Sequence, residues 1–322
     1  MNELTVNDYL DNLEIDRQEM INSLKSKGME LSDSATFTEL VTKIDGLVDI
    51  NEYYNLTKKT DGDFKSYITQ IPFIDTSEYT GMVDMFSGFT ALTEIPQLDT
   101  SNVVSMGSMF YGCSSLTSIP QLDTSNVTYM VAMFYNCKSL TTIPELNTSN
   151  VTNMYSMFSG CKSLITIPQL DTSNITSMYD MFTSCESLIT IPQLVTNNVT
   201  TFQNMFLHCE KLNNVPELNA EKVNRMSSCF SGCKDLENFG GLKDLGKAYD
   251  TTKSANYSYY TLSFINSTKL THDSLMNVIN NLYDIASIGV QPQKLQLGST
   301  NLSKLTEEEI AIATNKGWNV VA

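Results

Sequence analysis

Cysteine is the residue type whose spacing in this sequence most directly suggests chemistry. Six of the seven cysteines recur every 24 residues: Cys113, Cys137, Cys161, Cys185, Cys209 and Cys233. If the repeats stack, the Cα atoms of neighbouring cysteines lie about 5 Å apart, which is close enough for disulfides. Parallel side chains and synthesis in the cytosol favour free thiols, which pack as small hydrophobic groups. We therefore predict a structural ladder of buried thiols.

A zinc site is the alternative use of these cysteines. Cys229 and Cys233 are four residues apart, and Cys209 with His208 precedes them by one repeat. However, Cys229 occupies a position that holds methionine in the other repeats, and the close-spaced cysteine pairs of zinc sites are otherwise absent. The sequence predicts no metal site and no cofactor.

Four Asn-Val/Ile-Thr sequons recur with the same period, beginning at Asn126, Asn150, Asn174 and Asn198. A glycosylation acceptor needs a secretory route and an exposed side chain. Each asparagine also falls at the predicted start of a helix. We expect its side chain to cap that helix or to join a ladder of amide hydrogen bonds.

Acidic residues also form a column, at Asp99, Asp123 and Asp171. Val195 interrupts the column, and no calcium-binding loop pattern is present, so we expect these acids to favour helix starts electrostatically. The chain has two histidines, and it contains no Ser/His/Asp set and no phosphate-binding glycine loop. We predict that the protein is not an enzyme.

An internal repeat must position these columns. Met-Phe, or once Cys-Phe, recurs every 24 residues from Met85 to Phe230 with no insertion, in about seven copies. In each copy a short apolar segment ending in Ile-Pro predicts a strand, and Asp-Thr-Ser-Asn predicts a turn. The spacing of Ile175, Met178, Phe182 and Cys185 predicts a short helix. The predicted fold class is an α/β repeat, a leucine-rich-repeat solenoid of strand–turn–helix coils.

The strand side of such a solenoid is concave and commonly binds partners. Its candidate binding positions lie between the buried leucine and isoleucine of each repeat. They are Thr93, Glu94, Thr117, Ser118, Thr141, Thr142, Ile165, Thr166, Ile189 and Thr190, continued by Asn213 and Asn214. Their hydroxyl groups could bind a sugar or a protein strand, although threonine is equally expected on any solvated β-face.

The repeat L-D-T-S-N-V-T-x-M-x-x-M-F-x-G-C-x-S-L resembles the BspA-type (bacterial surface protein) leucine-rich repeat of adhesins and mycoplasmal lipoproteins. The resemblance covers about residues 71–240. It implies a leucine-rich-repeat protein that takes part in adhesion or other protein–protein interactions. The sequence differs from the family in having Ile-Pro where the usual, slightly longer unit has a second strand step.

The two ends differ from the repeat. Residues 1–48 predict two helices, too small a core to stand alone, which we expect to dock onto another protein or to oligomerise. Residues 49–70 predict a linker or N-terminal cap, and residues 241–322 predict longer coils that cap the C-terminal end. The strands of these longer coils begin at Leu262 and Leu295. Residues 21–47 resemble a helical element of phage structural proteins of Gram-positive hosts, and the last segment resembles the ends of phage-encoded repeat proteins.

Charge and composition limit the partners. The net charge of −16 disfavours nucleic acid and anionic membranes, and no apolar run is long enough to span a membrane. The N-terminus has no signal-peptide pattern. Together with the phage-like ends, this leads us to expect a non-enzymatic phage virion protein, a tail or capsid fibre or decoration. Residues 1–48 would contact other virion proteins, and the solenoid would bind a host-surface glycan or protein. A bacterial cell-surface adhesin and a cytosolic interaction scaffold are the alternatives.

Overall fold

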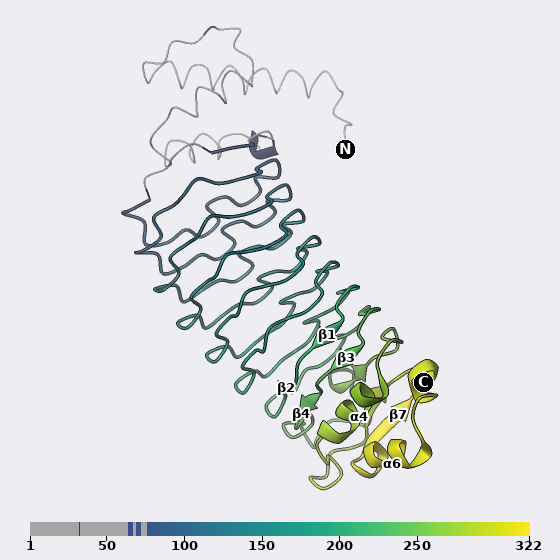
Figure 1. Ribbon diagram of the computed structural model, residues 1–322. Coiled ribbons are helices and arrows are strands. Elements are labelled where there is room, and N and C mark those ends of the chain that lie inside the picture. Colours follow the sequence, from purple (N-terminus) through teal and green to yellow (C-terminus); the bar gives the residue numbers. More distant parts are fainter. Residues whose placement is uncertain (1–31, 33–63, 67–68, 72–75) are drawn as a thin grey trace, which may run out of the picture.

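The computed structural model describes residue 32, residues 64–66, residues 69–71 and residues 76–322. The predicted helical element 1–48 and most of the predicted linker 49–70 therefore lie outside the described residues. Within the linker, Phe64–Ser66 form the 3₁₀ helix η1. The rest of the described chain forms a stack of coils, residues 76–241, followed by a C-terminal cap, residues 242–322 (Figure 1).

The coils of the stack are parallel and stay in register at the repeat length. Gly81 pairs with Ser105, Ser105 with Tyr129, and Tyr129 with Asn153, each 24 residues further along. Near the C-terminal end, β1 (Asn214–Val215) pairs with β3 (Asn238–Phe239), and β2 (Leu218–Asn219) pairs with β4 (Leu242–Lys243). An uninterrupted 24-residue repeat produces this arrangement because every side chain lies beside its counterpart in the next coil.

The predicted helix in each repeat is wrong: residues 76–241 contain no α-helix. The predicted strand is also wrong for most repeats, because the described coils before Asn214 are joined by isolated bridges and form no strand. In the coil around Met157 the backbone amides alternate between two kinds of partner. The amides of Ser156, Phe158 and Gly160 donate to carbonyl oxygens of the next coil, at 3.1, 3.0 and 2.7 Å. The amides between them, such as that of Met157, close local turns by donating three residues back. An α-helix would direct these amides along its own axis and leave few to join the coils.

Left-handed backbone conformations make this alternation possible. Two residues per coil, four apart, have positive φ, for example Ser156 (52°) and Gly160 (78°). Even Ala132 takes this conformation (52°), which costs about 1–2 kcal/mol for a residue with a Cβ atom. Inter-coil hydrogen bonds on the neighbouring amides compensate for this cost. The turns still bring apolar side chains inward at spacings of three and four, which explains why the sequence pattern is similar to that of a helix.

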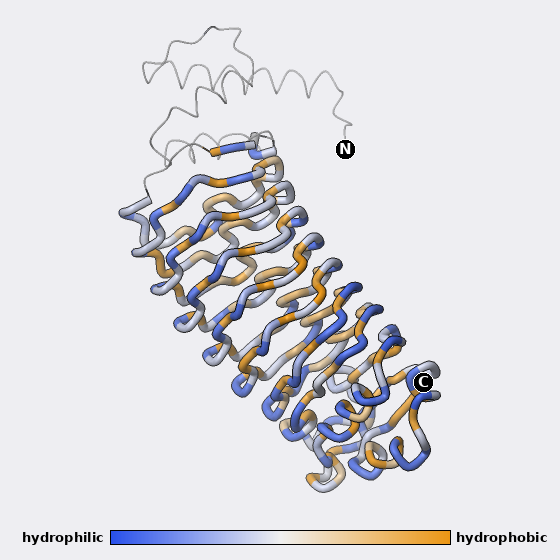
Figure 2. The backbone as a smooth tube through the Cα atoms, viewed as in Figure 1, coloured by the Kyte–Doolittle hydropathy of each residue, from blue (hydrophilic) through white to orange (hydrophobic). Residues whose placement is uncertain are grey.

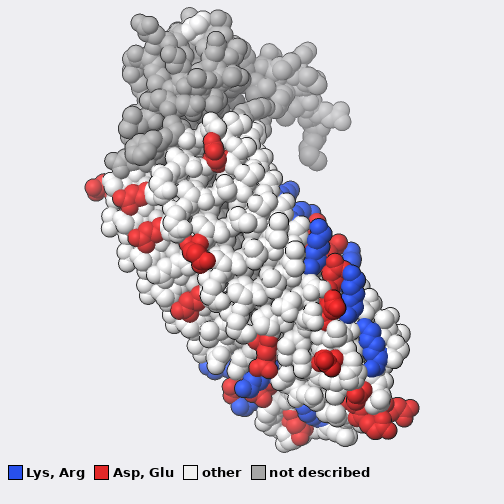
Figure 3. Space-filling view, in the orientation of Figure 1, with Lys and Arg blue, Asp and Glu red and all other residues white. Residues whose placement is uncertain are grey.

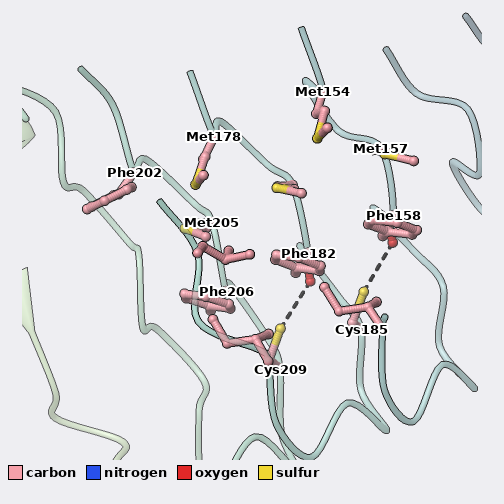
Figure 4. Packing of buried hydrophobic residues seen from close by; sticks show 14 of the residues in the cluster. Met154, Met157, Phe158, Met178, Phe182, Cys185, Phe202, Met205, Phe206 and Cys209 are labelled. Carbon is pink, nitrogen blue, oxygen red and sulfur yellow. Dashed lines mark hydrogen bonds between the residues drawn. The ribbon is translucent and has the colours of Figure 1, made fainter. Parts of the chain in front are cut away.

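The core consists of columns of similar apolar side chains. Figure 2 shows hydrophobic positions that recur from coil to coil. Phe158, Phe182 and Phe206 are fully buried, and the ring centroids of successive phenylalanines lie 5.6 Å apart with nearly parallel planes. The close-up in Figure 4 shows methionine and cysteine columns beside these rings. One coil alone could not bury these side chains, so each coil depends on its neighbours for stability.

The asparagine and aspartate columns act differently from the prediction, since no helix is present for them to cap. The Nδ2 atom of Asn174 donates to the backbone oxygen of Ser149 in the preceding coil at 2.8 Å. Asn126, Asn150 and Asn198 make the same bond. This is the predicted amide ladder without the predicted helix cap. The carboxylate of Asp171 accepts from the amide of Ser173 within its own turn, so the expected helix-dipole role is also wrong.

The C-terminal cap contains a parallel three-stranded sheet in the order β5 (Leu262–Ser263), β6 (Gln293–Gln296), β7 (Trp318–Val321). Leu262 and Leu295 are register partners. Here the longer units do form helices: α4 (His272–Asn281), α5 (Ser299–Leu302) and α6 (Glu307–Asn315), with the 3₁₀ helix η2 (Ser258–Tyr260) before β5. The side chains of Thr271 and Thr306 cap α4 and α6. The cap covers the C-terminal end of the stack (Figure 1).

Candidate functional site

The candidate binding surface, which we call the strand face, comprises the pairs of residues between the buried leucine and isoleucine of each coil. They are Thr93, Glu94, Thr117, Ser118, Thr141, Thr142, Ile165, Thr166, Ile189 and Thr190, followed by Asn213 and Asn214. All are exposed except Thr190 and Asn213, which are half-buried. The regular coils bring these residues together in two adjacent rows. The coils follow an almost straight line in Figure 1, so this view shows no marked concavity.

Hydrogen bonds engage some of the polar side chains in both rows. In the first row, Thr117 donates its amide and its hydroxyl to the carbonyl oxygen of Thr93, both at 3.2 Å. Ile165 and Ile189 continue this row of inter-coil bonds. In the second row, the hydroxyls of Ser118 and Thr142 have no hydrogen-bond partner among the described residues. Ser118 and Thr142 therefore present free hydroxyls to solvent, whereas the hydroxyls of Thr166 and Thr190 donate to the carbonyl oxygens of Ile167 and Ile191.

Two exposed isoleucines interrupt the rows of hydroxyl-bearing residues. Ile165 and Ile189 occupy equivalent positions in adjacent coils and are 45% and 48% exposed. The amide of Ile189 donates to the carbonyl oxygen of Ile165 at 3.0 Å, so the two side chains leave the same surface side by side. The two isoleucines form a small exposed apolar patch on an otherwise polar face.

On the face of the stack that Figure 3 shows, charged side chains lie mainly toward the edges. Figure 3 shows a broad face with few charges, acidic residues scattered toward one edge, and a row of lysines and acidic residues at the other. Inter-coil ion pairs on the stack include Lys162–Glu186 and Lys234–Glu210, each at 2.6 Å. Hydrogen bonding and attraction from Lys234 hold the pKa of Glu210 below its usual value. The two charges within each pair balance one another. On the strand face itself Glu94 is the one charged residue.

The cysteine column is inaccessible to ligands. All seven cysteines are buried free thiols. In the regular column each Sγ atom donates to the backbone oxygen of a phenylalanine in the preceding coil, for example Cys209 to Phe182 at 3.0 Å (Figure 4). Burial raises the pKa of the Cys113 and Cys233 thiols to about 12. The described part of the chain contains no group of three or more His, Cys, Asp or Glu residues arranged to hold a metal ion.

Sequence reasoning missed one cluster, at the junction of the coil stack with the C-terminal cap. Arg225 of the last regular coil lies there beside Lys253, Tyr257 and Tyr259 of the cap. The repeat pattern gives no indication of this contact, because the cap residues lie outside the 24-residue period. The tyrosine-rich run YSYY at 257–260 was the available signal.

These features define a repeat protein with coils of the leucine-rich type and a continuous, mostly uncharged side surface. No helix within the described ranges is long and apolar enough to cross a membrane. The chain belongs to the family described as "Mycoplasma protein of unknown function, DUF285", whose model matches residues 54–166, 139–241 and 162–271. Together these matches cover more than half of the chain.

Two solved structures resemble the chain more distantly. The crystal structure of a leucine-rich repeat protein from T. pallidum is 19% identical and covers 65% of this chain and 77% of its own, with a TM-score of 0.32. The TLR13–ssRNA13 complex is 11% identical and covers 87% of this chain and 49% of its own, with a TM-score of 0.28. At these values neither likeness carries over any property to this chain. No curated protein shows significant similarity.

Proposed function

We propose that this protein is a non-enzymatic binding protein that uses the strand face to hold a surface glycan or a protein. The exposed pair Ile165 and Ile189 is the observation that supports this most directly, because isolated apolar neighbours on a polar face gain free energy when a partner covers them. The free hydroxyls of Ser118 and Thr142 on the same face would supply hydrogen bonds. The near absence of charge allows a partner to approach without a large desolvation cost.

The finer proposal concerns where the protein acts. The phage-like resemblance of residues 21–47 supports a virion protein of tail or capsid, attached through residues 1–48 and displaying the coil stack to the host surface. These residues lie outside the described part of the chain, so this proposal rests on sequence resemblance alone. Membership of a family described from Mycoplasma favours the second candidate, a bacterial cell-surface adhesin.

Two experiments separate these proposals. Immunodetection in purified virus particles, on intact cells and in cytosol would locate the protein; its absence from particles and its presence on cells would overturn the virion proposal. For binding, labelled full-length protein is titrated onto host cells. Ile165→Lys should abolish saturable binding, because a charge replaces the apolar contact.

Val195→Lys is the matched control for the binding experiment. Val195 is 44% exposed, a value close to that of Ile165, but it occupies the aspartate column outside the strand face. The Val195→Lys variant should bind host cells as strongly as the unchanged protein does. Equal loss with both variants, or no loss with Ile165→Lys, would contradict a role for the strand face.

A further inference from the structure

A small open cavity lies where the last regular coil meets the C-terminal cap. It has a volume of about 240 Å³. Its chemically active lining residues are Arg225, Asp250, Lys253, Tyr257, Tyr259 and Tyr260. The volume is below the range of about 300–1,000 Å³ that holds drug-sized ligands, which suits a ligand the size of one sugar ring or a small acid.

Two cations face this cavity in a protein whose net charge is −16. The guanidinium of Arg225 lies 5.3 Å from the centroid of the Tyr259 ring, and its side chain makes no hydrogen bond or ion pair with any described residue. Lys253 lies 5.5 Å from the centroid of Tyr257 and 3.6 Å from a carboxylate oxygen of Asp250. Lys253 therefore has a carboxylate partner, whereas the guanidinium of the exposed Arg225 has none among the described residues and is open to a ligand. The guanidinium of an arginine without a protein partner can bind a carboxylate through two parallel hydrogen bonds.

Tyr257, Tyr259 and Tyr260 form one wall of the cavity beside these charges. Tyr260 is 3% exposed and stacks on Tyr249, with ring centroids 3.8 Å apart. Its hydroxyl oxygen accepts from the amide of Asp250 at 2.8 Å, which leaves its own proton free to donate. Tyr257 packs against Tyr260 edge to face at 5.0 Å, and Tyr259 is 39% exposed. The wall thus combines apolar ring surface with hydroxyl groups that can bond a polyhydroxylated ligand.

We propose that this cavity binds an acidic sugar, a monosaccharide unit that carries a carboxylate. The carboxylate pairs with Arg225 and Lys253, and the sugar ring lies against Tyr259. The hydroxyls of the sugar bond to Asn224, to the tyrosine hydroxyls and to Oδ2 of Asp250, whose Oδ1 already accepts from the amide and the hydroxyl of Thr252. An anion alone would use the two cations but not the acceptor carboxylate of Asp250, and a neutral sugar would leave Arg225 unpaired.

The test uses full-length protein and calorimetric titration with glucuronic acid at low salt. The expected result is saturable binding of one sugar per chain that weakens as salt is added. Arg225→Gln should weaken it by about tenfold or more, since it removes the unpaired cation. Lys211→Gln, which removes an exposed cation outside the cavity, should leave affinity unchanged. Absence of saturable binding, or equal affinity of Arg225→Gln and the unchanged protein, would overturn the proposal.

Three further ligands and one further variant test the assignment. Glucose tests the need for the carboxylate, and acetate tests the need for the ring; each should bind at least about tenfold more weakly than glucuronic acid. Equal binding of acetate would mean a general anion site and would overturn the sugar assignment. Tyr259→Ala should weaken glucuronic acid more than acetate. A short glutamate-rich peptide that outcompetes glucuronic acid would show instead that the site takes protein carboxylates.

This site is independent of the proposed strand-face function. The cavity shares no residue with the strand face. Ile165→Lys should therefore bind glucuronic acid normally, and the failure of either proposal leaves the other standing. Thermal unfolding of each variant checks that Arg225→Gln and Tyr259→Ala retain the fold.

Discussion

The Sγ atom of Cys185 donates a hydrogen bond to the backbone carbonyl oxygen of Phe158, 27 residues earlier, at 3.1 Å. The same contact recurs along the column, so each thiol links its coil to the coil before it. The carbonyl oxygen would otherwise be buried with one fewer partner. Cysteine is suited to this position because it is small, apolar enough to bury and still able to donate. The column is therefore a structural feature of the stack.

Thiol reactivity provides the first test of this column. Because all seven cysteines are buried, and burial raises the pKa of Cys113 and Cys233 to about 12, we expect almost no reaction with a thiol-specific reagent at pH 8. Denaturation should release seven reactive thiols. Fast reaction of the native protein would contradict the buried ladder.

Stability should fall at alkaline pH. The pKa of each buried thiol is raised in the folded state from its ordinary value of 9.0. Above pH 9 the unfolded chain has lost protons that the folded chain keeps, so the free energy of unfolding decreases as pH rises toward the folded-state pKa. The decrease approaches about 1.4 kcal/mol per pH unit for each thiol. Denaturant unfolding at pH 8, 9 and 10 measures it, and Cys185→Ala should show a shallower slope.

Truncation of the phenylalanine column should be severely destabilising. Phe182 is fully buried between Phe158 and Phe206. Phe182→Ala should lower the free energy of unfolding by about 3–5 kcal/mol, because it removes apolar surface and leaves a cavity that rigid neighbouring coils cannot close. Thr142→Ala, at an exposed site, should stay within about 0.5 kcal/mol. Similar values for the two variants in urea titrations would contradict the packing.

The amide ladder predicts an asymmetry between two replacements of Asn174. Asn174→Ala removes the donor to Ser149 and should cost about 0.5–1.5 kcal/mol. Asn174→Asp keeps the shape but places a carboxylate against a carbonyl oxygen, so it should cost more at pH 7 than at pH 3. A chemical-denaturation series at both pH values distinguishes this from a helix-cap role, in which aspartate would substitute well.

Gly160 and Gly112 provide a matched pair for the left-handed positions. Both have positive φ, 78° and 73°, so alanine at either should cost about 1–2 kcal/mol. At Gly160 a Cβ atom would also lie 2.1 Å from Oδ1 of Asn136, whereas at Gly112 the nearest atom is 3.9 Å away. Gly160→Ala should therefore have the lower melting temperature. An equal melting temperature would show that Asn136 moves aside without cost.

The limits of sequence reasoning are clearest in the segment from Met154 to Cys161. Its apolar spacing predicted the buried face correctly, because Met154, Met157, Phe158 and Cys161 all have zero exposure. It did not predict the backbone, because overlapping turns with left-handed residues produce the same spacing as a helix. The exposed positions of the strand face were predictable from the same repeat. The cluster around Arg225 was not, because the cap residues that meet it follow no period.

The sequence by itself determined the length of the coil and the identity of every core column, because a 24-residue repeat without insertions places equal residues side by side. The tertiary structure decided where the backbone hydrogen bonds go. The sequence of a single repeat does not show whether its backbone amides bond along a helix or to the next coil, because the carbonyl oxygens of the next coil are present only in the stack. Arg225 likewise contacts the tyrosines of the cap only because the cap packs against the last regular coil.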